Sequence, residues 1–227
     1  GWVAIRNSSH CGALAYFGRQ MAKADMIGIV FSHVDPMVLP FGARRPFHGT
    51  NPICIALPAA GGEMFCLDMA TSIVPWNVVQ NARIEGRKIA PRLAVDKNGR
   101  ETTDPNRVHA LYPFGGHRGS GLGLAIDLLC SMLSGSPFGP HIPAMYGDLT
   151  KRRDLGGLVG AFNIASFTSL RAFKGRVRQF MREVRALPPP ERAHPVLVPN
   201  DPETRCAAER TKHGIPLPSA VLEQFHL

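Results

Sequence analysis

An unbroken run of apolar residues, Met26 to Phe31, most constrains how this chain can fold. A strand of this composition is typical of a sheet whose two faces are both covered. We therefore predict a strand here that is buried on both faces. The segment before it, Gly12 to Ala24, carries Leu14, Phe17 and Met21 at helical spacing and is predicted to be a helix.

Short strand patterns and helix patterns follow one another along the rest of the chain. Strands are predicted at 53–57, 64–67, 93–96 and 158–164, and the end of a helix at 76–82. A helix opening in the glycine cluster at 115–123 should bury Leu122, Ile126, Leu129, Cys130 and Leu133 on one face. Further helices are predicted at 171–186, at 201–213 with Asp201 as N-cap, and after Ser219. The class is therefore α+β or mixed α/β.

The composition excludes several classes of protein. With 227 residues, 44% of them hydrophobic and 19% charged, the chain is not a disordered one. The longest apolar stretch, Leu122 to Leu133, contains Asp127 and is shorter than the roughly 20 residues that a membrane span needs. Residues 1–5 resemble a strand already under way rather than a targeting signal. We expect a cytoplasmic protein, and a chain that is a piece of a longer one.

The chain is basic, with 26 Lys and Arg against 17 Asp and Glu, a formal net charge of +9. The densest group of arginines comprises Arg152, Arg153, Arg171, Arg176, Arg178, Arg182 and Arg185. Most lie on the polar side of a predicted helix without interleaved aromatic residues, which favours a solvated helix face. An acidic partner is the alternative, and nucleic acid is not expected. The five cysteines form no Cys-x-x-Cys pair, so we predict buried thiols and no metal site.

His10 is the first candidate for chemistry. It follows the opening apolar segment and precedes the first predicted helix, so it lies in a loop at the end of an element. An imidazole titrates near neutral pH and suits proton transfer. A hydrogen-bonded surface histidine is the plainer alternative.

The glycine cluster at 115–123 is the second candidate. Backbone N–H groups at a helix N-terminus attract anions, and His117 and Arg118 add donors. The spacing Gly119-Ser120-Gly121-Leu122-Gly123 does not match the Gly-x-Gly-x-x-Gly dinucleotide pattern. The alternative is a glycine-rich helix start that packs closely against a sheet.

Seven short motifs taken together are more specific than any one of them. In order, they are Asn7-Ser8-Ser9-His10-Cys11-Gly12, the segments 35–42, 49–52, 68–72, 94–99 and 102–105, and Gly115-Gly116-His117-Arg118-Gly119-Ser120-Gly121. This series resembles the malate/L-lactate dehydrogenase family, which is distinct from the Rossmann dehydrogenases. The resemblance implies a non-Rossmann, nicotinamide-binding α/β fold with a mixed sheet flanked by helices. It also implies a cofactor-binding core at about 26–165 and a C-terminal helical part at about 166–227.

The resemblance assigns a role to individual residues. His10 matches the acid/base histidine, while Asp35 and Asn51 fall in substrate-binding segments. The matches to cofactor-binding positions are Asp68, Met69, Ala70, His117, Arg118, Gly119, Asn200 and Asp201. We expect NAD, because an acidic Asp201 would disfavour the 2′-phosphate of NADP, which remains the alternative. A homodimer is also implied.

The implied reaction is hydride transfer between a nicotinamide and a small 2-hydroxy acid, with His10 taking the proton of the alcohol. Oxidation of (S)-ureidoglycolate to oxalurate is the expected reaction, and malate, lactate or sulfolactate are alternative substrates. Three departures from the family pattern are Asn77-Val78 for Gly-Lys, Arg118 for Lys and Ser120 for Tyr. The family's helical segment ahead of His10 is missing from this sequence, so we expect poor activity or solubility of this chain alone. A non-catalytic relative that serves as a binding or dimerisation module is the further alternative.

Overall fold

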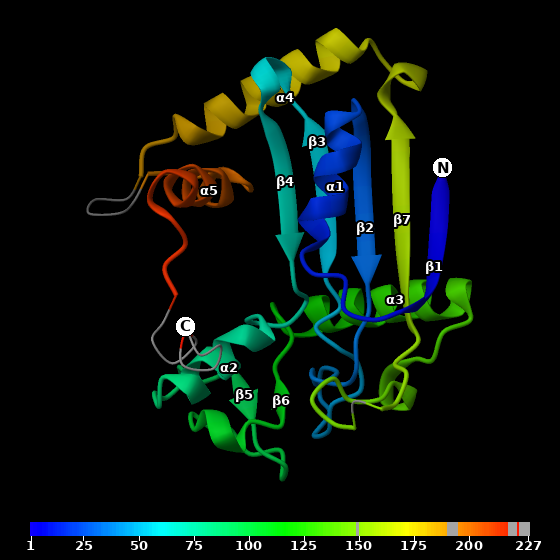
Figure 1. The fold of residues 1–227 in the computed structure, drawn as a ribbon, viewed down its shortest axis with the longest axis vertical. Coiled ribbons are helices and arrows are strands. Elements are labelled where there is room, and N and C mark those ends of the chain that lie inside the picture. The colour runs from blue at the N-terminus through cyan, green and yellow to red at the C-terminus, as the bar shows by residue number, and fades with distance from the viewer. Residues whose placement is uncertain (149, 190–194, 218–221, 223–227) are drawn as a thin grey trace.

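A computed structural model describes residues 1–148, 150–189, 195–217 and 222. Its centre is a five-stranded sheet with the strand order β1-β7-β2-β3-β4 (Figure 1). The strands are β1 (Trp2–Ser8), β2 (Met26–Ser32), β3 (Ile53–Pro58), β4 (Met64–Met69) and β7 (Leu155–Asn163). Every neighbouring pair in this sheet is antiparallel. The expected mixed α/β class is confirmed, whereas the expected mixed sheet is wrong, because all four pairs of the described five-stranded sheet are antiparallel.

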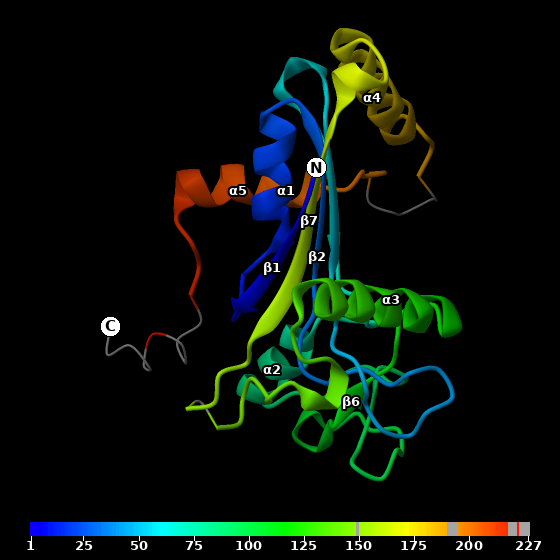
Figure 2. The same cartoon turned by 90° about the vertical axis from the view of Figure 1, so that its right-hand side faces the viewer.

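Strand β2 is the middle strand of the sheet, as its apolar run predicts. Helix α1 (Leu14–Lys23) covers one face, where Leu14 and Ala22 pack with Val30 and Cys54. Helix α3 (His117–Ser134) crosses the other face near the lower ends of the strands, where Ile126 and Cys130 meet Leu158. Figure 2 shows the two helices on opposite sides of the sheet. The prediction of burial on both faces is only partly confirmed, because Gly28, Val30 and Ser32 are buried while Ile27, Ile29 and Phe31 are half-buried. The central strand with a helix on each side accounts for the layered arrangement.

A smaller unit lies below the sheet in Figure 1. It contains helix α2 (Trp76–Ile84) and a two-stranded sheet of β5 (Ala94–Val95) and β6 (Ala110–Leu111). Its apolar core consists of Met37, Val38, Val79, Ala82, Ile89, Ala94, Val108 and Leu111. Short 3₁₀ helices are formed by Ala60–Gly62, Pro105–Arg107, Gly139–His141 and Ile164–Ser166. The chain enters this unit after β4 and leaves it through β6 and α3.

Two C-terminal helices extend from the upper end of the sheet. Helix α4 (Leu170–Arg185) buries Met181 against Ala59 and Val198, and α5 (Asp201–His213) follows beside β4. The predicted N-cap role of Asp201 is wrong, because the helix begins at Asp201 itself and Asn200 occupies the cap position. The Asp201 carboxylate instead accepts hydrogen bonds from Arg185 and from the backbone N–H of Val198.

Several burial predictions are also wrong. Leu129 and Leu133 on α3 are 40% and 60% exposed, because only a narrow stripe of the helix touches the sheet. Cys11 is exposed and Cys206 half-buried, whereas Cys54, Cys66 and Cys130 are buried as predicted. The helix predicted after Ser219 falls outside the described residues. In the described part of the chain, no helix has the length and apolar character of a membrane span.

The glycines of α3 give a matched pair of substitutions. A Cβ at Gly119 would collide with the backbone carbonyl oxygen of Phe114, whereas a Cβ at Gly121 would meet open space. We expect Gly119→Ala to lower the free energy of unfolding by about 3 kcal/mol, as in other overpacked sites. Gly121→Ala should raise it by about 1 kcal/mol, because alanine favours an exposed helix position. Urea unfolding measures both, and equal effects would contradict close packing at Gly119.

Candidate active site

His10 lies on an exposed loop between β1 and α1 that crosses the lower end of the sheet (Figure 1). Its Nδ1 accepts a hydrogen bond from the backbone N–H of Gly12 at 3.0 Å. In a neutral imidazole, one nitrogen accepts and the other carries the proton, so this contact places the proton on Nε2. The ring is thus anchored through one nitrogen while the side chain stays accessible.

Asp68 connects this loop to the end of strand β4. Helix α1 lacks a side-chain cap of its own, since its N-cap residue is Ala13. The Asp68 carboxylate supplies the cap from a distant part of the sequence by accepting a hydrogen bond from the N–H of Ala15 at 2.8 Å. The segment that carries His10 is therefore fixed to a residue predicted to contact the cofactor.

A cavity of about 390 Å³ lies beside His10. One wall is formed by residues 7–10, and the other by residues 144, 145, 148 and 150–154, which include Arg152 and Arg153. Two of its lining residues, Asn7 and Asp154, have φ angles of 56° and 48°. A left-handed backbone conformation is energetically costly for residues other than glycine, and such residues are more frequent at functional sites. The cavity is large enough for a small organic acid and presents cationic side chains next to the imidazole.

Asp35 does not line this cavity but binds two residues of its wall, Met145 and Arg153. Its buried carboxylate pairs with the guanidinium of Arg153 and accepts a hydrogen bond from the N–H of Met145 at 3.1 Å. Both carboxylate oxygens are therefore engaged within the protein, and Asp35 acts on the cavity through the segment that it holds. Local patterns could not predict this role of Arg153, which lies 118 positions further along the chain than Asp35.

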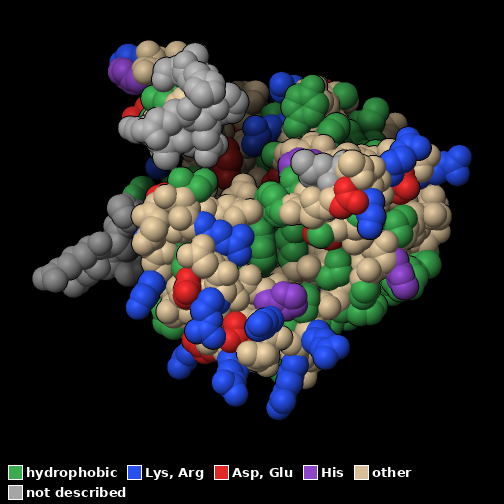
Figure 3. Space-filling view, turned by 60° about the horizontal axis from the view of Figure 1, so that its bottom comes forward, with side chains coloured by type: hydrophobic (Ala, Val, Ile, Leu, Met, Phe, Trp, Pro, Cys, Tyr) green, Lys and Arg blue, Asp and Glu red, His purple; other side chains and the backbone are tan. Residues whose placement is uncertain are grey.

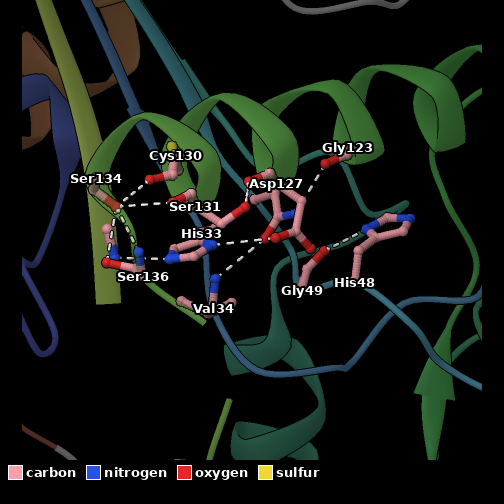
Figure 4. Close-up of polar contacts among 12 residues, drawn as sticks. His33, Val34, His48, Gly49, Gly123, Asp127, Cys130, Ser131, Ser134 and Ser136 are labelled. Atoms are coloured by element: carbon pink, nitrogen blue, oxygen red, sulfur yellow. Dashed lines mark hydrogen bonds and ion pairs between the residues drawn. The ribbon is translucent and has the colours of Figure 1, made fainter. Parts of the chain in front are cut away.

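A buried histidine that the sequence reasoning missed joins three elements next to this wall. His33 follows β2, and its Nδ1 lies 3.1 Å from a carboxylate oxygen of Asp127 on α3 (Figure 4). The other ring nitrogen, Nε2, accepts a hydrogen bond from the N–H of Gly156 at 2.7 Å, at the start of β7. The ring thus donates to Asp127 and accepts from Gly156. This arrangement fixes the ends of β2 and β7, whose adjoining segments carry Asp35 and Arg153.

Asn51 belongs to the same buried region and does not line the cavity. Its amide donates to the carbonyl of Gly123 at 2.9 Å and its oxygen accepts from the N–H of Val34 at 3.2 Å. His48 lies nearby and is fully buried, with Nδ1 2.8 Å from the carbonyl of Gly49 (Figure 4). Burial lowers the pKa of His48, which favours the neutral ring. These contacts give Asn51 a structural role between α3 and the loop after β2.

The residues predicted to bind the cofactor fall into three groups. Asp68, Met69 and Ala70 lie at the end of the outer strand β4, and Asn200 lies at its beginning, where its amide donates to the carbonyl of Met64 at 3.4 Å. Met64 precedes Asp68 by four residues, which corresponds to about 13 Å of extended strand. A ligand that contacts both groups must span this distance.

The third group is at the start of α3. His117 and Arg118 are exposed, whereas Gly119 is buried and donates its N–H to the carbonyl of Phe114 at 3.1 Å. Phe114 in turn donates to the carbonyl of Thr71 at 3.1 Å. The start of α3 is therefore adjacent to the segment that follows Asp68–Ala70, and close packing accounts for the glycine at 119.

The basic side chains are spread over the surface. Figure 3 shows Lys and Arg around the lower end of the molecule with acidic and apolar side chains among them. On α4, Arg178 and Arg185 bind Glu63 at 3.1 and 2.8 Å, and Lys174 binds Asp25 at 2.7 Å. The interpretation of this cluster as a solvated face is thus only partly correct, because several of its charges link α4 to the sheet.

Asp201 differs from its predicted environment. Arg185 contacts both of its carboxylate oxygens, at 2.6 and 2.9 Å, and this pairing holds the pKa of Asp201 below its usual value. Because the charge of Asp201 is compensated inside the protein, it does not supply the free carboxylate on which the preference for NAD over NADP was based.

The same pair predicts an acid-sensitive attachment of α5. A carboxyl group whose pKa is lowered by folding stabilises the protein above its unfolded pKa, near 3.8 for Asp201. That contribution disappears as the pH falls through the lower folded pKa. We expect the thermal midpoint of the wild type to fall more steeply below about pH 5 than that of Arg185→Gln. Circular dichroism melts across this range test it, and identical slopes would contradict it.

Comparisons with known proteins agree with the motif series. A family profile described as malate/L-lactate dehydrogenase matches residues 1–226. Ureidoglycolate dehydrogenase (NAD(+)) of Escherichia coli (strain K12) is 44% identical over 187 residues, which cover 82% of this chain and 54% of that protein. Malate/(S)-sulfolactate dehydrogenase of Methanothermus fervidus is 34% identical over 99% of this chain and 65% of its own length.

Solved structures show the same fold. A dehydrogenase from Sinorhizobium meliloti superimposes with a TM-score of 0.91 at 36% identity, over 99% of this chain and 65% of that one. Sulfolactate dehydrogenase from Methanocaldococcus jannaschii gives 0.87 at 33% identity, over 99% of this chain and 64% of that one. The chain thus spans between 54% and 65% of the length of these relatives.

Proposed function

This chain belongs to the malate/L-lactate dehydrogenase family, and from that premise we propose that it forms part of an enzyme that oxidises a small 2-hydroxy acid with NAD. We take (S)-ureidoglycolate, oxidised to oxalurate, as the substrate, because the ureidoglycolate dehydrogenase relatives show the higher identity. Malate and sulfolactate are the alternatives, since relatives with those names also match over nearly the whole chain.

One observation carries the proposal. The hydrogen bond from Ala15 to Asp68 fixes the loop of His10 to the end of β4, and the Thr71–Phe114 contact places the start of α3 next to that strand end. These contacts support a site at this end of the sheet that would combine a candidate acid/base group, an exposed carboxylate at a strand end and a cationic helix start. Asp68 and Asn200 lie along the same strand, at its end and near its beginning, so one extended ligand that follows β4 would contact both.

The donor set of the region fits a nicotinamide dinucleotide. Asp68, Met69 and Ala70 would hold one part of it, Asn200 another, and His117 and Arg118 would bind its anionic portion. A nicotinamide held there would supply the acceptor for the hydride that leaves the carbinol carbon of the substrate. The chain itself supplies orientation, charge and a group for proton transfer.

His10 would hold the proton that leaves the substrate hydroxyl. In the structure its Nδ1 is occupied by the N–H of Gly12, so the neutral ring carries its proton on Nε2. To act as a base, the ring must in either case give up the hydrogen bond from Gly12. It takes the hydroxyl proton at Nδ1, or it carries its own proton on Nδ1 and takes the hydroxyl proton at Nε2. In the reverse direction, the imidazolium returns that proton to the alkoxide oxygen.

A binding and turnover experiment on the complete protein tests the proposal. NADH or NADPH is titrated while nicotinamide fluorescence is followed, and (S)-ureidoglycolate, malate, lactate and sulfolactate are then assayed with both oxidised cofactors. We expect fluorescence enhancement by NADH together with turnover of a 2-hydroxy acid. The absence of both would contradict the proposal and favour a non-catalytic binding module.

We also propose that the protein is a homodimer. The outer side of α3 exposes Leu128, Leu129, Met132 and Leu133 as neighbouring apolar side chains, and exposed apolar patches are typical of interfaces. Sedimentation equilibrium on the complete protein should give twice the mass of one complete polypeptide, and a monomer would contradict this assignment.

A further inference from the structure

The cavity beside His10 has an uneven distribution of charge. Its wall contains the sequence Lys151-Arg152-Arg153-Asp154. Arg153 is paired with the buried carboxylate of Asp35, and the Lys151 ammonium lies 4.0 Å from a carboxylate oxygen of Asp148. Within the described residues, neither Arg152 nor Asp154 has a side-chain hydrogen bond or an ion pair. The cavity therefore offers one uncommitted cation and one uncommitted carboxylate.

The backbone at Asp154 supports a role for this carboxylate. The residue is half-buried and its φ is 48°, a left-handed conformation that disfavours residues other than glycine, asparagine and aspartate. It lies directly before β7, whose Gly156 is fixed by His33, while Arg153 is fixed by Asp35. Asp154 is thus held between two anchored neighbours, and its unpaired carboxylate belongs to a positioned segment of the wall.

We propose that Arg152 and Asp154 recognise the two ends of the substrate. Arg152 binds its carboxylate, and Asp154 accepts hydrogen bonds from an N–H group at the other end. The preferred substrate class is therefore a monocarboxylate that carries an amide or ureido group, rather than a dicarboxylate. A second carboxylate would be repelled by Asp154, and this repulsion provides discrimination. This inference rests on the proposed function, since it takes the cavity as the site of the 2-hydroxy acid.

Two small anions can distinguish recognition of both ends of a ligand from non-selective binding of anions in the cavity. Oxamate has one carboxylate and one amide, and oxalate has the same shape with two carboxylates. The complete protein is treated with diethyl pyrocarbonate, which modifies accessible imidazoles. The modification of His10 is followed by peptide mass spectrometry. The concentration of each probe that protects His10 gives its affinity without any need for turnover. We expect oxamate to protect at roughly 10-fold lower concentration than oxalate, since one set of charge-assisted hydrogen bonds is replaced by repulsion.

Two variants and two matched controls assign the roles. Arg152→Gln should weaken protection by both probes by about 10-fold or more, because both use the guanidinium. Asp154→Asn should weaken protection by oxamate and strengthen protection by oxalate, so that the preference for oxamate disappears. Asparagine tolerates the left-handed backbone at this position, so the fold should be preserved. Lys151→Gln and Asp148→Asn alter charges on the same wall that already have partners, and should leave the ratio of the two probes unchanged.

The possible outcomes separate the inference from the proposed function. Failure of both probes to protect His10, equal protection by oxamate and oxalate, or an unchanged preference in Asp154→Asn would overturn the inference. An effect of Lys151→Gln equal to that of Arg152→Gln would also overturn it. Turnover of a 2-hydroxy acid without any oxamate preference would leave the proposed function standing while the inference fails. Selective protection of His10 by oxamate in a protein that does not bind the nicotinamide cofactor would support the two recognition roles and contradict the proposed dehydrogenase function.

Discussion

Replacing His10 with alanine is expected to lower kcat for the 2-hydroxy acid by roughly 10²–10⁴-fold, the usual cost of losing a general acid/base. The imidazole is exposed in a loop anchored at Gly12 and, through α1, at Asp68, so its removal should leave the fold intact. The affinity for NADH, measured by fluorescence, should change little, because the predicted cofactor contacts lie on β4, α3 and the start of α5.

His213→Ala serves as the matched control, since His213 is exposed on α5 away from the cavity. It should retain wild-type kcat and NADH affinity. Turnover within about threefold of the wild type in His10→Ala would remove His10 from the chemistry, because a lost acid/base group costs far more than that.

Asp35→Ala is expected to lower the free energy of unfolding by roughly 3–5 kcal/mol, the cost of leaving one partner of a buried ion pair uncompensated. The side chains of Asp35 and Arg153 are only 5% and 10% exposed. The same substitution also releases the N–H of Met145, so the cavity wall that contains Met145 and Arg153 should loosen and KM should rise. Urea unfolding and steady-state kinetics measure the two effects.

The double variant Asp35→Leu with Arg153→Met distinguishes the loss of one charge of the ion pair from the loss of both. Replacing both charges with apolar groups removes the buried unpaired charge and should recover most of the lost stability. Lys151→Ala is the exposed control, with a side chain that is 67% exposed, and should cost no more than about 1 kcal/mol. Equal destabilisation by Asp35→Ala and Lys151→Ala would contradict the structural role of the buried pair.

The elements that could be predicted from the sequence are those with a strong local pattern. The apolar run of β2, the amphipathic spacing of α4 and the boundary of α5 at Gly214 all depend on neighbouring residues. Periodicity shows which residues share a helix face, but the width of the covered stripe depends on the partner surface. Leu129 and Leu133 were therefore assigned to the core and lie on the surface.

The candidate site was only partly accessible to the same reasoning. His10 and the glycine cluster stand out through residue type and position, whereas His33, Asp127 and Arg153 are ordinary in their local context. Their partners are 94 to 123 residues away, so only the fold reveals the contacts. Local sequence predicts Asp201 as the N-cap of α5, whereas Asn200 takes that position and the Asp201 carboxylate binds Arg185, a contact that only the fold reveals.

Isotope transfer tests the central claim most directly. The complete protein is incubated with NAD and a 2-hydroxy acid that carries deuterium on its carbinol carbon, and the NADH produced is examined by mass spectrometry and NMR. Direct hydride transfer predicts NADH with deuterium on the nicotinamide ring, formed rapidly by the wild type and very slowly by His10→Ala. Absence of NADH, or NADH that contains only solvent hydrogen, would contradict hydride transfer by this protein.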